Sequence, residues 1–190
     1  MAILLFIITL FFLKPAFGSE TNSEIIFSTG NARILGDLGG DASSTVFMLQ
    51  SRSTSSRTIP MWTDIIRTEI GIGIDLIYLE RRNGPSEFLF SPDTSMVMKG
   101  IFLIPTACFF RNVDYRLCFG LGNGTLNTNT AKNRQDYGTW NYQIDGHIQL
   151  TDKVMLKLIS KYIGKIEQRI AERDSSFSLG ILAMGLGVRF

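Results

Sequence analysis

The sequence lacks the residues and runs on which several functional classes depend. Its 190 residues include one histidine and two cysteines, and 19 Lys and Arg nearly balance 17 Asp and Glu. With no second histidine and no cysteines two or four residues apart, metal-ligand spacing is absent. The balanced charge indicates neither nucleic-acid binding nor an acidic tail. After residue 18, no uninterrupted apolar stretch is long enough for a membrane helix.

The amino terminus, MAILLFIITLFFLKPAFGSE, carries a 12-residue apolar run over residues 2–13. As a helix this run would span about 18 Å, against the ~30 Å of a bilayer core, so a membrane anchor is the weaker interpretation. Ala16 and Gly18 are small residues at the two positions that a signal peptidase reads. We therefore expect a secretory signal peptide over residues 1–18 and one further domain over residues 19–190.

The rest of the chain alternates between apolar and polar or small residues with period two. In RTEIGIGIDLIYLE, Ile70, Ile72 and Ile74 share one face, while Gly71 and Gly73 share the other. TWNYQIDGHIQL follows the same rule, which is typical of strands. Together with the turn signals, the pattern predicts strands over residues 24–35, 43–54, 62–81, 94–110, 115–126, 137–150, 153–167 and 175–190.

Eight alternating strands predict an all-β fold, an eight-stranded antiparallel transmembrane β-barrel. The breaks RNVD and TD are tight, whereas RNGPSEFLFSPD and NTNTAKNRQD are long and polar, which is the asymmetry of outer-membrane barrels. The connection SRSTSSRTIP over residues 51–60 fits this topology poorly, because a short periplasmic turn is expected there and the stretch is not short. A soluble lipocalin-like barrel or a β-sandwich is the alternative. The small residues on the second face favour the membrane barrel, whose narrow lumen leaves little room for side chains.

Aromatic residues give a separate test, because Trp and Tyr collect where a barrel wall crosses the two lipid interfaces. In the predicted topology, one belt lies near the outer interface and the other near the periplasmic interface. The outer belt contains Tyr78, Trp140, Tyr142 and Tyr162, and the periplasmic belt contains Trp62, Tyr115 and Phe190.

The chain ends on SSFSLGILAMGLGVRF, in which Leu182, Met184, Leu186, Val188 and Phe190 alternate with small residues. This final strand resembles the assembly signal of bacterial outer-membrane β-barrels. The resemblance implies that the barrel-assembly machinery of a Gram-negative bacterium recognises Leu186, Val188 and Phe190. It implies localisation in the outer membrane and says nothing about activity.

A set of charged residues is expected to face the lumen: Arg67, Glu69, Asp75, Lys99, Arg116, Asp145, His147, Lys157 and Lys161. Unpaired charges away from water are costly, so opposite signs should meet across the lumen. The favoured interpretation is a polar plug that holds the strand register. The sharper hypothesis treats Asp145 and His147, two residues apart on one strand, as an acid–base pair.

Cys108 and Cys118 flank the RNVD turn. In an oxidising periplasm they could form a disulfide if the loop has an odd number of residues. With a four-residue loop, Cys108 would face Leu117 and the bond could not form. Pro105 suggests a bulge that would alter the register further.

The order of TEIGIGIDLIYLE, GIFLIPTACFF, RLCFGLGNGTL, IDGHIQLTDKVMLKLISKYIG and FSLGILAMGLGVRF resembles the lipid A 3-O-deacylase (acyloxyacyl hydrolase) family over roughly residues 60–190. In that family the second-last strand carries a His and a Ser two residues apart. The corresponding LISKYIGKIEQ has Ser160 and Tyr162 but no His, and a nucleophilic Ser needs a base. With Asp145 and His147, Ser160 remains a weak catalytic candidate.

We therefore expect a structural, adhesive or surface-interaction barrel without catalysis. A lipid A hydrolase and a small-solute channel are the alternatives, and the channel is disfavoured because eight strands leave the lumen filled. The expected partners are outer-membrane lipid, lipopolysaccharide and the barrel-assembly machinery, with no nucleic acid, no cofactor and no metal. We expect a monomer.

Overall fold

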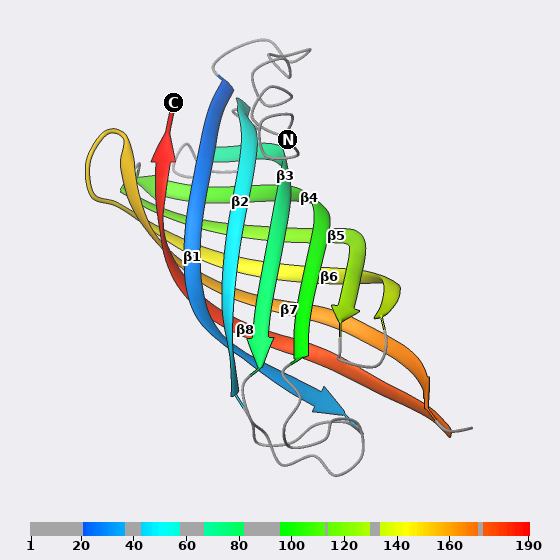
Figure 1. Cartoon of the computed structure of the whole chain (residues 1–190). Helices are drawn as coiled ribbons and strands as arrows, with labels where there is room; N and C mark the ends of the chain where they lie inside the picture. Colours follow the sequence, from blue (N-terminus) through cyan, green and yellow to red (C-terminus); the bar gives the residue numbers. More distant parts are fainter. Residues whose placement is uncertain are drawn as a thin grey trace, which may run out of the picture.

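The computed structural model shows a closed barrel of eight strands (Figure 1). It describes residues 21–36, 43–57, 67–81, 96–112, 114–129, 134–170 and 173–190. The predicted signal peptide and Trp62 lie outside these residues. The strands are β1 (Thr21–Gly36), β2 (Ser43–Arg57), β3 (Arg67–Arg81), β4 (Met96–Asn112), β5 (Tyr115–Asn129), β6 (Arg134–Gln149), β7 (Val154–Ile170) and β8 (Arg173–Arg189). Within the described part of the chain, no helix is long and apolar enough to cross a membrane.

Every strand pairs antiparallel with its neighbours in sequence, and β1 pairs with β8 to close the barrel. The closing register places Glu24 opposite Arg189 and Gly36 opposite Phe177. Closure pairs the first strand with the last, as a barrel in lipid requires. Between β6 and β7 the pairing covers Asn141–Gln149 and Met155–Ile163 only. The predicted all-β, eight-stranded antiparallel barrel is confirmed.

The two rims of the barrel differ in how they connect the strands. β1 begins and β8 ends at one rim (Figure 1), where Asp114 forms the β4–β5 turn and residues 150–153 bend between β6 and β7. We call this the periplasmic rim, and the opposite one the outer rim. The predicted loop NTNTAKNRQD is wrong in length, because β5 continues to Asn129 and β6 begins at Arg134. Its Asn and Thr side chains are weak strand signals, and pairing across the hairpin extends the strands through them.

The stretch over residues 51–57, interpreted as part of a connection, belongs to β2. It pairs with β1, with Ser51 opposite Ile25 and Thr54 opposite Asn22, and also with β3. Serine and threonine give little apolar contrast, so alternation is hard to recognise in this stretch. The strand therefore ends at Arg57, three residues after the predicted end at residue 54, and residues 51–57 belong to a strand rather than to a connection.

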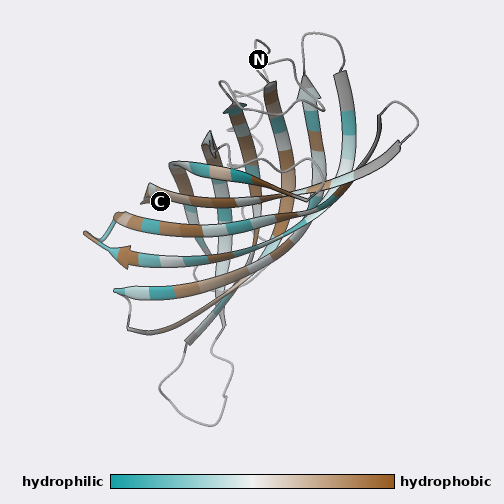
Figure 2. Ribbon diagram, turned by 90° about the horizontal axis from the view of Figure 1, so that it is seen from below, coloured by the Kyte–Doolittle hydropathy of each residue, from teal (hydrophilic) through white to brown (hydrophobic). Residues whose placement is uncertain are grey.

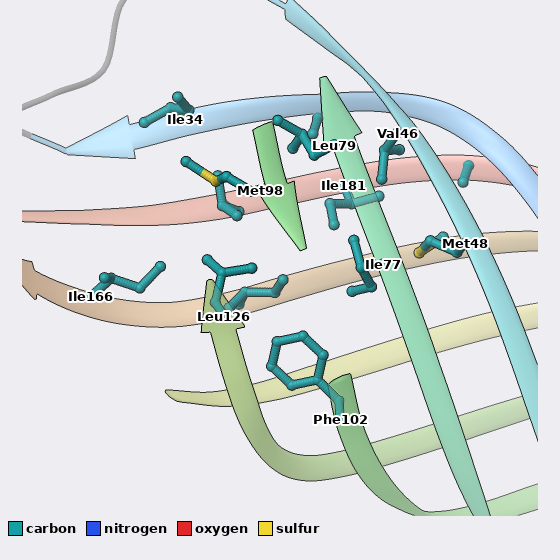
Figure 3. Packing of buried hydrophobic residues seen from close by; sticks show 14 of the residues in the cluster. Ile34, Val46, Met48, Ile77, Leu79, Met98, Phe102, Leu126, Ile166 and Ile181 are labelled. Carbon is teal, nitrogen blue, oxygen red and sulfur yellow. The ribbon is translucent and has the colours of Figure 1, made fainter. Parts of the chain in front are cut away.

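A cluster of apolar side chains fills the lumen toward the outer rim (Figure 3). Phe102 and Ile104 occupy the space that the inward glycines leave open. A Cβ at Gly124 would lie 2.7 Å from Phe102 Cδ1, and one at Gly122 would lie 2.8 Å from Ile104 Cγ1. Other members of the cluster are Ile34, Val46, Met48, Ile77, Leu79, Met98, Leu126, Ile159, Ile163, Ile166, Phe177, Leu179 and Ile181. The outer half of the lumen is thus packed with side chains.

Candidate functional site in the polar lumen

The barrel is apolar outside and polar inside over its periplasmic half (Figure 2 shows hydropathy along the strands). On β3, Ile70 and Ile72 are about half exposed on the outer wall, while Glu69 and Asp75 are buried in the lumen. A soluble barrel requires the opposite arrangement, because exposing an apolar wall to water is unfavourable. Other exposed apolar side chains of the wall are Phe27, Ile101, Leu103, Leu117, Phe119, Leu121, Ile144, Leu158, Leu182, Met184 and Leu186.

The middle of the lumen is organised around the carboxylate of Asp145. Its Oδ2 lies 2.5 Å from Arg52 Nη2 and 3.2 Å from Lys157 Nζ, and all three side chains are buried. Its Oδ1 accepts a hydrogen bond from Gln143 Nε2 at 2.6 Å. Because Arg52 comes from β2 and Asp145 from β6, this ion pair joins opposite walls of the barrel.

A second set of contacts lies next to Asp145, toward the outer rim. Lys161 Nζ donates to Asp75 Oδ2 at 2.6 Å and to Gln143 Oε1 at 3.2 Å. Gln50 Nε2 donates to the same two groups, at 2.7 Å and 3.3 Å. Two amides therefore link the Asp75–Lys161 pair to Asp145, so the network continues across the lumen from β2 and β3 to β6 and β7.

Near the periplasmic rim, two carboxylates and two guanidinium groups form a third set. Arg116 Nη1 lies 2.8 Å from Glu69 Oε2 and 3.6 Å from Glu24 Oε1. Arg189 Nη2 lies 2.8 Å from the same oxygen of Glu24. These contacts hold charges of opposite sign close together where water is scarce, which offsets part of their desolvation cost.

The structure places Glu69, Asp75, Arg116, Asp145, His147, Lys157 and Lys161 in the lumen, all of them buried. The side chain of Arg67 lies outside the described residues. Lys99 is exposed on the outer wall, so its predicted place in the lumen was wrong. The reason is strand parity: Met98, Gly100 and Phe102 face inward, and Lys99 therefore faces outward.

The other members of the network were missed in the sequence: Glu24, Gln50, Arg52, Gln143 and Arg189. Glu24 lies at the start of the first strand, and Arg52 lies in the stretch interpreted as a connection. The alternation of Met48, Gln50, Arg52 and Thr54 was the available signal, since all four face inward. It is weak because serines occupy the intervening outward positions.

The hypothesis of an Asp145–His147 acid–base pair meets a geometric obstacle. His147 Nε2 lies 3.8 Å from Asp145 Oδ2, too far for a hydrogen bond, and that oxygen faces Arg52 and Lys157 instead. Ser160 is exposed on the outer wall, opposite Ile144 and Leu182, whereas His147 is buried inside. The two residues lie on opposite faces of the wall, so the imidazole has no route to the Ser160 hydroxyl.

Cys108 and Cys118 form a disulfide that faces the lumen. They are opposite each other in the β4–β5 register, which shifts between Phe109 and Asn112. The prediction that a regular four-residue loop would place Leu117 opposite Cys108 was wrong, because a regular loop does not include this register shift. No register shift occurs at Pro105, where a bulge was expected; Pro105 pairs regularly with Ile72.

The Cys118 sulfur also lies within 4.8 Å of ligand atoms of Asp145 and His147. In the disulfide this sulfur is not a thiolate, and thiolate is the form of cysteine that binds metals. With the bond intact, Asp145 and His147 are the two groups of this trio that could offer a metal a ligand atom.

No protein-family model matches the chain, and no curated protein matches it. Solved structures do match. Ail, the attachment invasion locus protein of Yersinia pestis, crystallised in complex with the heparin analogue sucrose octasulfate, has 15% sequence identity and a TM-score of 0.54, with 90% of this chain and 99% of that chain covered. Neisserial surface protein A has 15% identity and a TM-score of 0.58, with 88% and 97% covered. The beta domain of the Bordetella autotransporter BrkA has 10% identity and a TM-score of 0.52, with 90% and 98% covered. The chain thus has the fold of bacterial outer-membrane β-barrels, and its apolar wall is suited to contact with lipid.

Proposed function

We propose that this barrel has a structural, adhesive or surface-interaction role and catalyses no reaction. The observation that supports this best is the filled lumen. The apolar cluster occupies its outer half, and ion pairs that cross from wall to wall occupy the rest. A protein whose interior is packed in this way acts through its outer rim and its outer wall.

A filled lumen argues against a solute channel. Arg52 and Asp145, at 2.5 Å, occupy the centre, and Phe102 and Leu126 are fully buried nearer the outer rim. Purified barrel in planar bilayers should therefore show no stable single-channel steps in 1 M KCl. Regular, reproducible steps from the folded barrel would favour the channel.

The lipid A hydrolase is the second candidate because of the resemblance in segment order, and the geometry argues against it. A serine hydroxyl at its ordinary pKa is a poor nucleophile near neutral pH without a base. Expression of the protein in a bacterial host should leave the lipid A acyl pattern unchanged in mass spectra. Loss of an ester-linked chain, abolished in Ser160→Ala, would make the protein an enzyme with Ser160 as nucleophile.

The adhesive role is supported by exposed basic residues near the outer rim, of which Arg33 on β1 and Lys165 on β7 are examples. Ail, a protein of the same fold, was crystallised with a polysulfated sugar. We propose that this barrel likewise contacts polyanions at its outer rim.

The test uses bacteria that express the barrel, applied to surfaces coated with heparin. Cells with wild-type protein should adhere more than cells with the double variant R33Q/K165Q at equal surface levels, and 0.5 M NaCl should remove the difference. Asp152→Asn, at the periplasmic rim, is the matched control. Adhesion no greater than that of cells without the barrel would exclude the adhesive role and leave the structural one.

A further inference from the structure

On the outer wall, two polar side chains of β5 follow its apolar ones toward the outer rim. On β5 the outward residues are Leu117, Phe119 and Leu121, followed by Asn123 and Thr125, which are exposed. Neither polar side chain hydrogen-bonds to another residue in the described part of the chain. Polar groups without partners are costly against lipid chains, so these two are expected to meet a polar partner from the membrane.

The neighbouring strands enclose these two residues with apolar side chains. Asn123 lies between Leu103 of β4 and Trp140 of β6, and the backbone at Thr125 lies between Ile101 and Gly138. The result is a groove of about 860 Å³ on the outer wall. Its lining includes Leu103, Pro105, Leu121, Asn123, Thr125, Gly138 and Trp140. We call this the outer-wall groove.

The groove exists because two glycines shape it. A Cβ at Gly138 would meet nothing within 4 Å, so the missing side chain leaves open space on the wall. Trp140 lies over Gly164, where a Cβ would come within 2.3 Å of the indole Cε2. Tyr142 and Tyr162 pack against the same indole, with ring centroids 6.0 and 5.9 Å away. One side of the groove is therefore held in place before anything binds, which lowers the entropic cost of binding.

The groove lies at the outer edge of the apolar band. Tyr115 stands at the periplasmic rim, and Asn123 follows it by 123 − 115 = 8 residues along β5. At a rise of ~3.3 Å per residue and a tilt of ~40°, Asn123 lies roughly 20 Å above that rim, in a band ≈ 25 Å tall. Leu103 and Leu121 thus face acyl chains, while Asn123 and Thr125 lie at the level where acyl chains join their headgroup.

A cation follows the polar pair toward the outer rim. Lys99 is exposed on the wall, one outward position beyond Ile101, and pairs with Asn127. Its amine lies 6.0 Å from the Tyr78 ring centroid. The nearby Asp136 carboxylate accepts a hydrogen bond from the Asn127 amide. From the membrane centre outward, the wall therefore presents apolar side chains, then an amide and a hydroxyl, and then the Lys99 amine with the Asp136 carboxylate at the same level.

We propose that the outer-wall groove binds one lipopolysaccharide molecule of the outer leaflet through its lipid A. An acyl chain packs against Leu103, Leu121 and Trp140. The amide and sugar oxygens of lipid A meet Asn123 and Thr125, and a phosphate approaches Lys99. This inference depends on the membrane placement of the barrel and not on the adhesive role.

The test measures lipid retained by the purified, folded barrel. Wild type and variants are incubated with bisphosphorylated hexa-acyl lipid A or with phosphatidylglycerol, and bound lipid is counted by native mass spectrometry. Gly138→Leu fills the groove. Gly146→Leu is the matched control, because Gly146 lies outward on the same strand and a Cβ there also meets nothing within 4 Å. The double variant N123L/T125L removes the polar pair without adding charge to the wall.

Wild type and Gly146→Leu should retain intact lipid A in preference to phosphatidylglycerol. Gly138→Leu and N123L/T125L should each retain about tenfold less lipid A, as expected for a blocked site or two lost hydrogen bonds. Lys99→Gln should lower the preference for bisphosphorylated over dephosphorylated lipid A about fivefold. Equal retention by wild type and N123L/T125L, or equal binding of both lipids to wild type, would overturn the proposal. If Gly138→Leu fails to fold, N123L/T125L decides the outcome.

Discussion

Arg189 of the last strand donates a hydrogen bond from Nη2 to Oε1 of Glu24 in the first strand, at 2.8 Å. The pair lies on the β1–β8 seam that closes the barrel, and Arg116 approaches the same oxygen at 3.6 Å. The Glu24 carboxylate therefore contacts two guanidinium groups where the two ends of the sheet meet, and Arg116 also pairs with Glu69 at 2.8 Å. Glu24 therefore takes part both in the closure of the barrel and in the lumen network.

Removing that carboxylate should destabilise the barrel. Glu24→Ala leaves Arg189 without its carboxylate and Arg116 with Glu69 alone, which should lower the free energy of unfolding by about 3 kcal/mol. Urea unfolding of the barrel in lipid vesicles, followed by gel mobility without boiling, measures this loss. Asp152→Ala changes an exposed acid in the β6–β7 turn and is the control. A midpoint equal to that of wild type would mean that the seam does not need this ion pair.

The Asp75–Lys161 pair should behave as a buried unit. Both side chains are fully buried, with Lys161 Nζ 2.6 Å from Asp75 Oδ2. Asp75→Leu leaves a buried ammonium group without its counterion and should cost about 3–5 kcal/mol, while the double variant D75L/K161M should recover most of that loss. Urea midpoints of wild type, Asp75→Leu, Lys161→Met and D75L/K161M form a double-mutant cycle. Additive effects of the two changes would show that the residues are not coupled.

A charged side chain in place of Ile72 on the lipid-facing wall should destabilise the barrel. This side chain is 49% exposed on β3, and an Arg near mid-membrane is expected to cost about 2–4 kcal/mol. Gly73→Ala, at the next residue on the lumen face, should cost less, because its Cβ would make two tight contacts, with Arg52 Cγ at 3.1 Å and Ser51 O at 3.3 Å, but would place no charge in lipid. Folding titrations in vesicles compare the two variants. Wild-type stability of Ile72→Arg, with the protein in the soluble fraction, would indicate an inside-out barrel.

The Cys108–Cys118 disulfide should stabilise the β4–β5 hairpin without being needed for the fold. Closing a loop across a sequence separation of 10 is expected to contribute about 2–3 kcal/mol. Both residues are buried, so a reductant should leave the bond intact in the folded barrel and cleave it after boiling in detergent. Alkylation followed by mass spectrometry reports the state of the thiols. Free thiols in the folded protein before reduction would contradict the β4–β5 register.

Most of the strands are readable from the sequence because period-two alternation is a local property. The isoleucines of β3 and the leucines of β8 define an apolar wall whatever the neighbouring strands do, so the all-β class and the number of strands follow from such patterns. Serine-rich residues 51–57 show the limit of this approach. There, alternation of chemically similar residues carried too little contrast, and pairing with β1 and β3 determined the strand.

Registers and contacts across the lumen were decided by the tertiary structure alone. The shift between Phe109 and Asn112 places Cys118 rather than Leu117 opposite Cys108, and no local pattern shows it. Gln50 and Gln143 meet across the lumen although 93 residues separate them in sequence. Such contacts depend on the register between each strand and the next, and on the sum of these registers around the closed sheet. The sequence by itself determined which side chains face lipid and which face the lumen along most strands. The closed register alone determined which of the lumen side chains meet, because that geometry belongs to the whole barrel and to no single segment.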